Sequence, residues 1–232
     1  KTIFCTADDE LRPVMNGIFF DLSEEGVTMV ATDAHRLVRY SNDSVKGAQV
    51  VNFILPKKPA QLLRQVLQKE SEEVVVTFGQ KNAKFAFGTT LIVCRQIEGR
   101  FPNYKAVIPS NNPNQVVVDR HTLINACKRV AVFANTGTSL LKLALSENSI
   151  KISAQDIDFS TSAEETIACD YAGMPMSIGF KAPFLIEILS NITSQDVLLQ
   201  LADPARAGLI LPAENDEGQD LLVLLMPMLL ND

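Results

Sequence analysis

Asp33 and His35 are the residues whose types and spacing could support catalysis in this sequence. They lie in the stretch ATDAHRLVRY, which begins at Ala31 and also carries two arginines. On a strand, residues two apart project from the same face, so a carboxylate and an imidazole here could form a general acid–base pair. The alternative is a turn at a strand end, in which Asp33 accepts hydrogen bonds from nearby backbone amides.

A second stretch of the chain favours the turn. LSEEGVTMVATD begins at Leu22 and LSENSIKISAQD begins at Leu145, so the two align without a gap at an offset of 123 residues. Asp156 takes the place of Asp33, but an isoleucine and an aspartate follow it, and no histidine does. An acid that is repeated without its histidine indicates a turn residue and not a catalytic one.

The rest of the sequence offers no other catalytic motif. It has no GxSxG, P-loop or GxGxxG motif, and no carboxylate cluster with metal-ligand spacing. Two histidines and four widely spaced cysteines without a CxxC pair make a poor set of zinc ligands. We therefore expect no catalytic residue, no metal site and no cofactor.

The composition is that of a globular protein. Of the 232 residues, 47% are hydrophobic and 21% are charged, and the length fits one large domain or two of about 100–120 residues. The net charge of −6 argues against a protein that coats nucleic acid with its whole surface. It leaves room for a local basic face, because steering depends on the distribution of charge.

The cysteines and the apolar segments indicate a cytoplasmic protein. Cys5, Cys94, Cys127 and Cys169 are expected to be free thiols in a reducing cytosol. The longest apolar run, LLVLLMPMLL, contains a proline and is far shorter than the ~20 residues that a membrane span requires. No signal peptide is visible.

A second pair of similar segments extends the repeat. ILPKKPAQLLRQVLQ begins at Ile54 and IGFKAPFLIEILSNI begins at Ile178, an offset of 124 residues. Each predicts a strand, a basic residue, a proline in the first helical turn and an amphipathic helix. Further strands follow both helices, so the chain is predicted to be two copies of one α+β unit rich in antiparallel sheet.

The limits of the two copies follow from composition. The segment IPSNNPNQ, residues 108–115, is the predicted linker, and a boundary near residue 112 gives domains of residues 1–112 and 113–232. The first residues, KTIFCTADDELRPVMNG, have the pattern of a helix tail without its beginning. We therefore expect the chain to be a fragment of a longer protein.

Two predicted helices have faces without acidic residues. The helix that begins near Pro59 would bury Leu62, Leu63, Val66 and Leu67, and its opposite face carries Lys57, Gln61, Arg64, Gln65 and Gln68. The helix in DRHTLINACKRVAVFAN would bury Leu123, Cys127 and Val130, and it presents Arg120, Asn125, Lys128 and Arg129. Such faces are either ordinary solvated surface or a surface that contacts phosphates without recognising bases.

The end of the chain is unusually apolar. The run from Leu221 to Leu230 could bury alternate residues as a strand, but Pro227 prevents its continuation as a central strand. Flexible methionines beside a proline also suit an adaptable apolar groove for partner peptides. Core packing is the alternative.

Taken together, four stretches resemble the bacterial DNA polymerase III β subunit family, the sliding clamps. They are RPVMNGIFF from Arg12, VATDAHRL from Val30, EGRFPNYKAVIP from Glu98 and LLMPMLL from Leu224, in the family's order and approximate spacing. The resemblance covers the second and third of the family's three domains. It implies an α+β DNA-clamp fold of two repeated domains, each with antiparallel sheets and two helices.

The resemblance also implies a function without chemistry. Family members close as head-to-tail dimers into a ring around duplex DNA, and they tether the replicative polymerase to its template. The clamp is an accessory subunit of the polymerase and not an enzyme. Its implied partners are non-specifically bound double-stranded DNA, and the polymerase, clamp loader and repair proteins, which bind through short peptide motifs.

Site residues are implied by position within the resemblance. An apolar peptide-binding groove between the two domains would include Met15, Thr32, His35, Arg36, Leu37, Pro102, Val107, Phe184, Leu224, Leu225, Met226, Pro227, Met228 and Leu230. DNA-facing residues would be Lys57, Lys58, Arg64, Arg120, Lys128 and Arg129. Val132 and Phe133 match positions where the third domain meets the partner's first domain. The chain departs from the family at Ala34, where glycine is usual, and at Ala106 and Leu229, where arginine is common.

Two other functions remain open on the sequence. One is a two-domain peptide-binding module unrelated to DNA. The other is an enzyme that uses Asp33 and His35.

Overall fold

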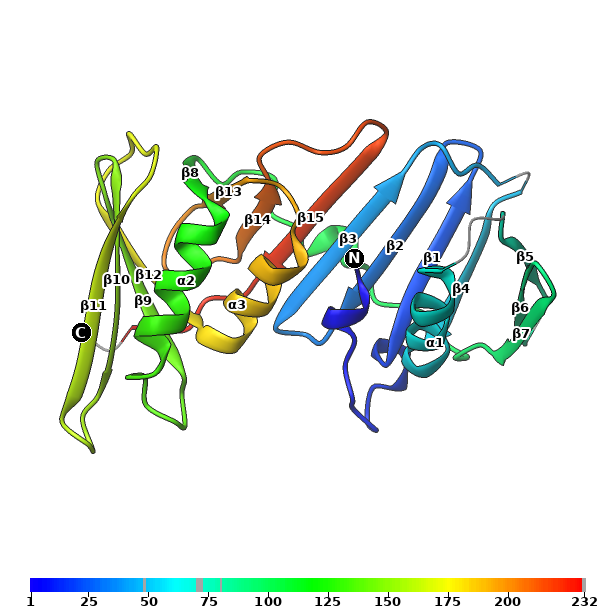
Figure 1. Ribbon diagram of the computed structural model, residues 1–232, viewed down its shortest axis with the longest axis horizontal. Coiled ribbons are helices and arrows are strands. Elements are labelled where there is room, and N and C mark those ends of the chain that lie inside the picture. The colour runs from blue at the N-terminus through cyan, green and yellow to red at the C-terminus, as the bar shows by residue number, and fades with distance from the viewer. Residues whose placement is uncertain (48, 70–72, 80, 231–232) are drawn as a thin grey trace. The chain divides into compact units, whose positions relative to one another are not determined.

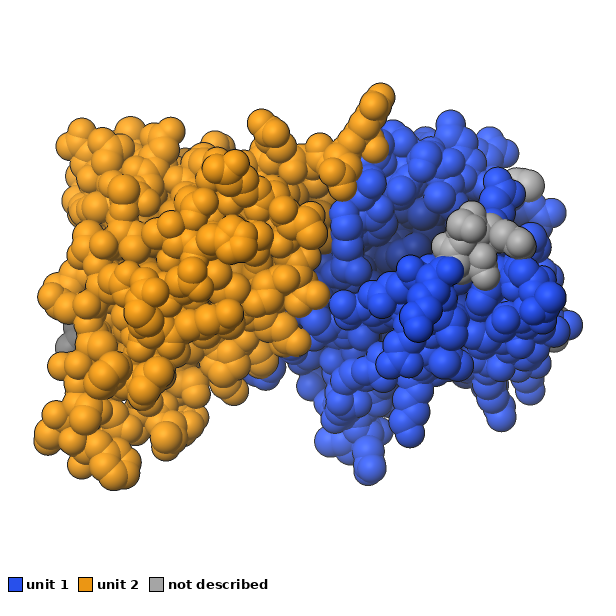
Figure 2. Space-filling model, viewed as in Figure 1, with its two compact units in different colours: residues 1–104, 218–220 blue, residues 105–217, 221–232 orange. Residues whose placement is uncertain are grey.

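The computed structural model describes residues 1–47, 49–69, 73–79 and 81–230 (Figure 1). The chain divides into two compact units, coloured separately in Figure 2. The first unit comprises residues 1–104 with residues 218–220, and the second comprises residues 105–217 with residues 221–232. Helices and antiparallel sheets make up both units, which confirms the predicted α+β class.

The first unit contains one four-stranded sheet, one three-stranded sheet and a helix. The first sheet has the strand order β4-β1-β2-β3, and the second has the order β5-β6-β7. The elements are η1 (Ile3–Cys5), η2 (Pro13–Met15), β1 (Gly17–Ser23), β2 (Gly26–Thr32), β3 (Arg36–Asn42), β4 (Val51–Pro56), α1 (Lys57–Leu67), β5 (Val75–Phe78), β6 (Asn82–Phe87) and β7 (Thr90–Arg95).

Aromatic side chains join the two sheets of this unit. The ring centroids of Phe20 on β1 and Phe53 on β4 are 4.8 Å apart, and those of Phe53 and Phe78 on β5 are 4.5 Å apart. Aromatic contacts at these distances contribute both buried area and favourable ring geometry. The sheet β5-β6-β7, at the right-hand end of Figure 1, therefore packs on the unit through the face that carries Phe78.

The second unit contains two four-stranded sheets and two helices. The sheets have the strand orders β11-β10-β9-β12 and β15-β14-β13-β8. The short helix η3 (Tyr104–Ala106) begins at the unit boundary. The other elements are β8 (Asn114–Asp119), α2 (Arg120–Ala131), β9 (Leu140–Ser146), β10 (Ser149–Asp156), β11 (Thr161–Ala168), β12 (Met176–Lys181), α3 (Ala182–Asn191), β13 (Asp196–Leu201), β14 (Gly208–Pro212) and β15 (Gln219–Leu225).

The order of elements repeats between the units. β1 and β2 begin 123 residues before β9 and β10, as the sequence predicts, but β4 and α1 begin 125 residues before β12 and α3, instead of the predicted 124. The difference arises in one turn. Three residues, 33–35, join β2 to β3, whereas four residues, 157–160, join the longer strand β10 to β11.

The helices differ in part from the prediction. The second unit has the two that were expected, but the described part of the first unit has one α-helix, and the segment expected to be a helix tail forms only two three-residue 3-10 helices, η2 and, nearer the start, η1. η1 stops because Thr6 is already extended, with φ −71° and ψ 140°. In α1, Ala60 and Leu63 are buried, whereas Leu62 is exposed, because it lies about 100° around the helix from Leu63.

The predicted linker is not a free connection. Asn112 is buried, and its side-chain amide donates hydrogen bonds to the carbonyl oxygens of Gln200, at 2.9 Å, and Ala207, at 3.0 Å. These contacts fasten the segment before β8 to the second unit, to which all residues from Lys105 to Glu217 belong. In the described part of the chain, no helix is long and apolar enough to cross a membrane.

Candidate binding surfaces

The acid and histidine of the first unit lie in a tight turn between β2 and β3. Asp33 Oδ1 accepts hydrogen bonds from the backbone N–H groups of His35, at 3.0 Å, and Arg36, at 2.9 Å. Thr32 Oγ1 donates to the Arg36 carbonyl at 2.8 Å and accepts from the Ala34 N–H at 3.1 Å. Because residues 33–35 are outside the strands, the argument that Asp33 and His35 share a strand face is wrong.

Arg36 is buried by the turn that contains it. Its Nε lies 2.9 Å from Asp33 Oδ2, and its Nη2 donates to the carbonyl oxygen of Phe4 at 2.9 Å. The guanidinium carbon lies 5.6 Å from the centre of the Phe4 ring. Arg36 therefore fastens the turn to the η1 segment, and the Asp33 carboxylate is fully engaged in this structure. His35 is exposed.

The second unit repeats the turn acid without the arginine. Asp156 Oδ1 accepts hydrogen bonds from the backbone N–H groups of Asp158, at 3.0 Å, and Phe159, at 3.3 Å. The two bonds go to the same positions, two and three residues onward, as those of Asp33. The interpretation of both aspartates as structural turn acids is confirmed.

The first-unit residues that the resemblance assigns to the peptide groove differ in exposure. Thr32, Arg36 and Leu37 are buried, Met15 and Pro102 are half-buried, and His35 is exposed. Met15 ends η2, and its carbonyl oxygen accepts the Ala7 N–H at 2.9 Å. The accessible part of this set is therefore His35 with parts of Met15 and Pro102.

The second-unit residues of that set divide at the end of β15. Leu224 and Leu225 are buried in the core, whereas Met226 is 43% exposed and Val107 is 57% exposed. Phe184, Pro227, Met228 and Leu230 are half-buried. The strand ends at Leu225, before the proline, as the sequence predicts.

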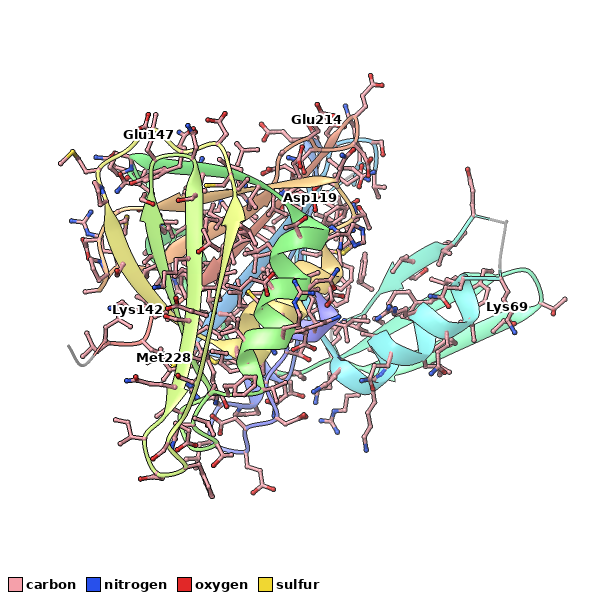
Figure 3. All side chains as sticks on the ribbon, turned by 60° about the vertical axis from the view of Figure 1, so that its left-hand side comes forward. Lys69, Asp119, Lys142, Glu147, Glu214 and Met228 are labelled. Carbon is pink, nitrogen blue, oxygen red and sulfur yellow. The ribbon has the colours of Figure 1, made fainter. Side chains whose placement is uncertain are left out.

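The residues after β15 are held against the edge of β12. The Met228 N–H donates to the Gly179 carbonyl at 2.8 Å, and the two residues form an isolated antiparallel bridge. Gly179 also pairs with Lys142 on β9, so Figure 3 shows Met228 near the sheet that carries Lys142. A Cβ at position 179 would lie 2.7 Å from the Met228 carbonyl oxygen and 2.9 Å from Leu230 Cδ2.

Gly179 and Lys181 are additions that the sequence did not identify. Lys181 Nζ lies 5.1 Å from the centre of the Phe184 ring, within reach of a cation–π interaction. The glycine between two apolar positions of a predicted strand was a usable signal, because such glycines often mark a close backbone approach.

The predicted DNA-facing residues of the first unit lie on α1. Lys58 and Arg64 are exposed, whereas Lys57 is partly covered and its Nζ pairs with Asp8 Oδ2 at 2.6 Å. Gln61, Gln65 and Gln68 are also exposed. The described residues of α1 include no acidic side chain, as the sequence predicts.

The three basic residues of α2 have different roles. Arg120 donates to the carbonyl oxygens of Ser194, at 2.8 Å, and Leu189, at 3.3 Å, so it satisfies the end of α3. Arg129 forms two bonds with Glu165 on β11, at 2.9 and 2.5 Å. Hydrogen bonding to Glu165 raises the pKa of Arg129, and the same bonds lower the pKa of Glu165. Lys128 is exposed and has no ion pair among the described residues.

Exposed apolar side chains lie directly after α2 and within the longer turn that follows β10. Val132 is 79% exposed and Phe133 is 39% exposed. Ile157 and Phe159, in the turn, are 80% and 74% exposed. Asn135 Nδ2 lies 3.4 Å from carboxylate oxygens of both Asp156 and Asp158, which places the two segments side by side. The turn after β10 is longer than its counterpart after β2, and this difference between the repeats was a sequence signal that could have marked the turn as a candidate surface.

Among the described residues, no group of three or more His, Cys, Asp and Glu side chains could hold a metal ion. All four cysteines are free thiols. Burial raises the pKa of the Cys127 thiol to about 12.

Comparison with protein families gives a match in each unit. The family described as "DNA polymerase III beta subunit, central domain" matches residues 1–103, and "DNA polymerase III beta subunit, C-terminal domain" matches residues 105–228. The chain is 30% identical to the beta sliding clamp of Pseudomonas aeruginosa over 229 residues. It is 28% identical to that of Escherichia coli over 227 residues.

Solved structures give the same result for the fold. A crystal structure of the DNA polymerase sliding clamp from Pseudomonas aeruginosa has a TM-score of 0.94 and 30% identity, over 99% of this chain and 63% of that one. Another clamp from this organism, bound to griselimycin, has a TM-score of 0.93 over 99% of this chain and 61% of that one. The two curated relatives align with 98% of this chain, which spans 61% of their length.

Proposed function

Because the chain belongs to the DNA polymerase III beta subunit family, we propose that it forms the middle and C-terminal domains of a sliding clamp that holds a DNA polymerase on duplex DNA. The observation that carries this proposal is the match of both repeated units, in order, over almost the whole chain. The proposal includes no catalytic step, which agrees with the engagement of the Asp33 carboxylate in its turn. It places the protein in the cytoplasm, where bacterial DNA is replicated.

In this proposal the clamp acts by enclosing DNA and not by recognising a sequence. A ring that slides must contact phosphates weakly, because strong or base-specific contacts would fix its register. The exposed cations Lys58, Arg64 and Lys128 suit such contacts. Arg120 and Arg129 contribute less, since their donors already bind protein oxygens.

Binding to DNA can be tested with this chain alone. We expect weak, sequence-independent binding to a duplex that falls steeply with salt concentration. Replacing Lys58 and Lys128 with glutamate should weaken binding and reduce the slope of log K against log salt by about one per lysine. Lys151→Glu, an exposed lysine of β10 that pairs with Glu164, is the matched control and should change the slope less. Tight or sequence-selective binding would contradict the proposal.

We further propose that partner peptides bind the apolar surface at the end of β15. Met226 and Val107 are its exposed residues, Phe184, Met228 and Leu230 its half-buried ones, and Leu224 and Leu225 support it from the core. The first-unit residues that the resemblance assigns, Met15, Thr32, His35, Arg36, Leu37 and Pro102, remain part of this proposal.

The affinity of one peptide for the protein and its variants tests this surface. A peptide that ends in a Leu-Phe pair after a glutamine should bind with its apolar end on the surface. Burying one large apolar side chain is worth roughly 1.5–3 kcal/mol before the costs of association. Met226→Ala should therefore raise the Kd by about tenfold, whereas His35→Ala should cost less. Calorimetric titration gives both values.

A second methionine serves as the control for the effect of Met226→Ala on peptide binding. Met174→Ala removes another exposed methionine of the second unit, 80% exposed, and should leave the Kd unchanged. If Met226→Ala binds like the parent while His35→Ala abolishes binding, the apolar surface is wrong. A polar site in the Thr32–Arg36 turn would then replace it.

Ring closure is the third part of the proposal. Val132 and Phe133 would contact the first domain of a partner clamp subunit, and their exposure supports this assignment. Because that interface needs a first domain, two copies of the 232-residue chain should not close into a ring. Sedimentation that shows a stable two-chain ring of this chain would contradict this part.

A further inference from the structure

Lys181 lies at the edge of the apolar surface that follows β15. It is the last residue of β12, and its Nζ lies 5.1 Å from the centre of the Phe184 ring on α3. A cation–π contact attracts the ammonium group to the face of the ring, but it does not neutralise the charge. Lys181 therefore brings a positive charge to a surface whose other second-unit residues are apolar.

The strand register places Lys181 beside the segment that forms this surface. Met228 and Gly179 form an antiparallel bridge. Because paired antiparallel segments run in opposite directions, the residue two positions before Met228 has the register position of the residue two positions after Gly179. These residues are Met226 and Lys181, so the register brings the exposed methionine towards the end of β12 that carries the lysine.

Within the described residues, no acidic side chain pairs with this lysine. Lys181 has its contact with the Phe184 ring and no ion pair. Residues 171–186 and 221–230 contain no aspartate or glutamate, and the acid nearest to Lys181 in the sequence is Glu187 on α3. Lys142, opposite Gly179 on β9, is a second lysine on the same face of this sheet. The charge of Lys181 is therefore available to a ligand.

The repeated fold does not require a lysine at this position. β4 of the first unit ends at Pro56, whereas β12 of the second unit ends at Lys181. The lysine that follows Pro56, Lys57, pairs with Asp8 at 2.6 Å, so an acid of the same unit engages it. Lys181 differs from Lys57 because an aromatic ring, and not a carboxylate, holds its ammonium group.

We propose that Lys181 makes the apolar surface select peptides that carry a carboxylate next to their apolar end. The ammonium group would pair with this carboxylate while apolar side chains of the peptide cover Phe184 and Met226. The carboxylate can come from two sources, the C-terminus of the peptide or an acidic side chain beside the apolar end. The inference rests on the peptide surface proposed above, and it adds the charge of the ligand that this surface prefers.

The expected size of the preference follows from the environment of the lysine. Exposed ion pairs typically change an equilibrium by about fivefold at most. Lys181 is half-buried beside apolar groups, and partial removal of water strengthens the attraction between opposite charges. We therefore expect a preference near the upper end, about three- to fivefold. The preference should shrink at high salt concentration, because salt screens the pair.

The test uses the 232-residue chain and three versions of one peptide, in which two alanines separate a glutamine from a terminal Leu-Phe pair. The first version has a free C-terminal carboxylate, and the second has a C-terminal amide. The third has the amide and an aspartate in place of the second alanine. Calorimetric titration should give a Kd about three- to fivefold lower for the first or the third version than for the second. The version that binds more tightly identifies the source of the carboxylate.

Substitutions of Lys181 separate its charge from its packing. Lys181→Met keeps an apolar stem over the Phe184 ring but removes the charge, so the preference should disappear while the Kd of the uncharged peptide stays the same. Lys181→Arg should keep the preference. Lys151→Met, which removes a lysine of β10 that pairs with Glu164, is the matched control and should also keep it. A purely structural role of Lys181 would change the three Kd values by one common factor.

The failure of this inference differs from the failure of the peptide surface. Equal affinity of the parent for all three peptides, or a Lys181→Met protein that keeps the parental preference, would overturn the inference. The peptide surface would remain in place if Met226→Ala still weakened binding of every version. If Met226→Ala left all three Kd values unchanged, or if the parent bound none of the peptides, both the surface and this inference would be wrong.

Discussion

Arg36 Nε lies 2.9 Å from Asp33 Oδ2 in an ion pair whose side chains are only 7% and 16% exposed. The same arrangement occurs at Asp203 and Arg206, where the aspartate also accepts the backbone N–H groups two and three residues onward. There the side chains are 47% and 63% exposed, and the Nε–Oδ2 distance is 3.3 Å. The chain therefore contains one motif, Asp-x-x-Arg, in a buried and an exposed form.

The two forms predict different costs for the loss of the acid. Asp33→Ala leaves the Arg36 guanidinium buried without its carboxylate, so we expect a loss of about 3–5 kcal/mol in the free energy of unfolding. Asp203→Ala, its matched control, breaks an exposed pair and a turn, and should cost about 1 kcal/mol. Urea denaturation of the two variants gives both values. Equal losses would show that burial of the pair does not matter.

The turn acids show what the sequence could predict. The internal repeat made Asp156 the counterpart of Asp33, and this was enough to separate a structural acid from a catalytic one. Burial of Arg36 could not be predicted, because it depends on the Phe4 carbonyl and ring, which are 32 residues away in the chain. The types and spacing of residues along the chain predict local geometry, but they do not predict contacts between residues so far apart in the sequence.

The site residues show the same limit. A helical face without acids correctly predicted that Arg64 and Lys128 are exposed, but Lys57 of the same predicted face is partly covered and pairs with Asp8. The pattern gave Arg120 and Arg129 the same role, although distant groups, the end of α3 and Glu165, engage their donors. The apolar pattern of this helix also failed to show that Leu62 faces solvent. Which side of α1 faces the core depends on where the preceding strand ends.

Ala34 has a backbone conformation that favours glycine. Its φ is 75°, in the left-handed region, where a Cβ costs about 1–2 kcal/mol. Ala34→Gly removes this strain but gains freedom in the unfolded chain worth about 0.4–1 kcal/mol, so we expect a net stabilisation of roughly 0.5–1 kcal/mol. Ala31→Gly, in the buried part of β2, should instead destabilise the protein. Thermal unfolding measures the stability of both variants. If Ala34→Gly lost stability as Ala31→Gly does, the strain argument would be wrong.

The cap of α2 predicts a pH dependence on the acidic side. Asp119 Oδ1 accepts the Thr122 N–H at 2.6 Å, at the helix start labelled in Figure 3. Hydrogen bonding to the side chain of Thr122, and next to its backbone N–H, lowers the pKa of Asp119 below its ordinary value of 3.8. Because the folded pKa is below the unfolded one, the cap contributes stability above the unfolded pKa. That contribution is lost as the pH falls through the folded pKa.

Asp119→Asn keeps a capping oxygen but removes the titration. We expect the parent to be more stable than the variant at pH 7, with a difference that is constant down to about pH 5. Below pH 3.8 the difference should shrink, because only the parent loses this charge. Urea denaturation from pH 7 to pH 2.5 measures it. A difference that stays constant over the whole range would remove Asp119 as the cause.

The cysteines should differ in reactivity with a disulfide reagent. Burial raises the pKa of Cys127 to about 12, and Cys127 and Cys5 are fully covered, so neither should react in the folded protein. Cys94 is 8% exposed, and only Cys169 is substantially accessible. At pH 8 we expect one thiol to react slowly in the native protein and four in urea. Labelling of Cys127 without denaturant, identified by mass spectrometry, would mean that its helix opens readily.

Gly179 should control the segment that follows β15. A Cβ at this position would meet the Met228 carbonyl oxygen at 2.7 Å and Leu140 Cδ1 at 2.9 Å, distances that force a neighbour to move. Overpacking of this kind typically costs about 1–3 kcal/mol. We expect Gly179→Ala to lose stability in this range and to break the bond from the Met228 N–H to the Gly179 carbonyl.

Two measurements separate this effect from general destabilisation. Hydrogen exchange should accelerate at the Met228 amide but not at the buried Leu225, which belongs to β15. Peptide binding should weaken together with the exchange, because Met226 and Met228 lose their fixed positions. Gly79→Ala, where a Cβ would meet its nearest neighbour at an ordinary 3.6 Å, should change neither quantity. If Gly179→Ala keeps both the slow Met228 amide and the parental Kd, the bridge to β12 does not position this surface.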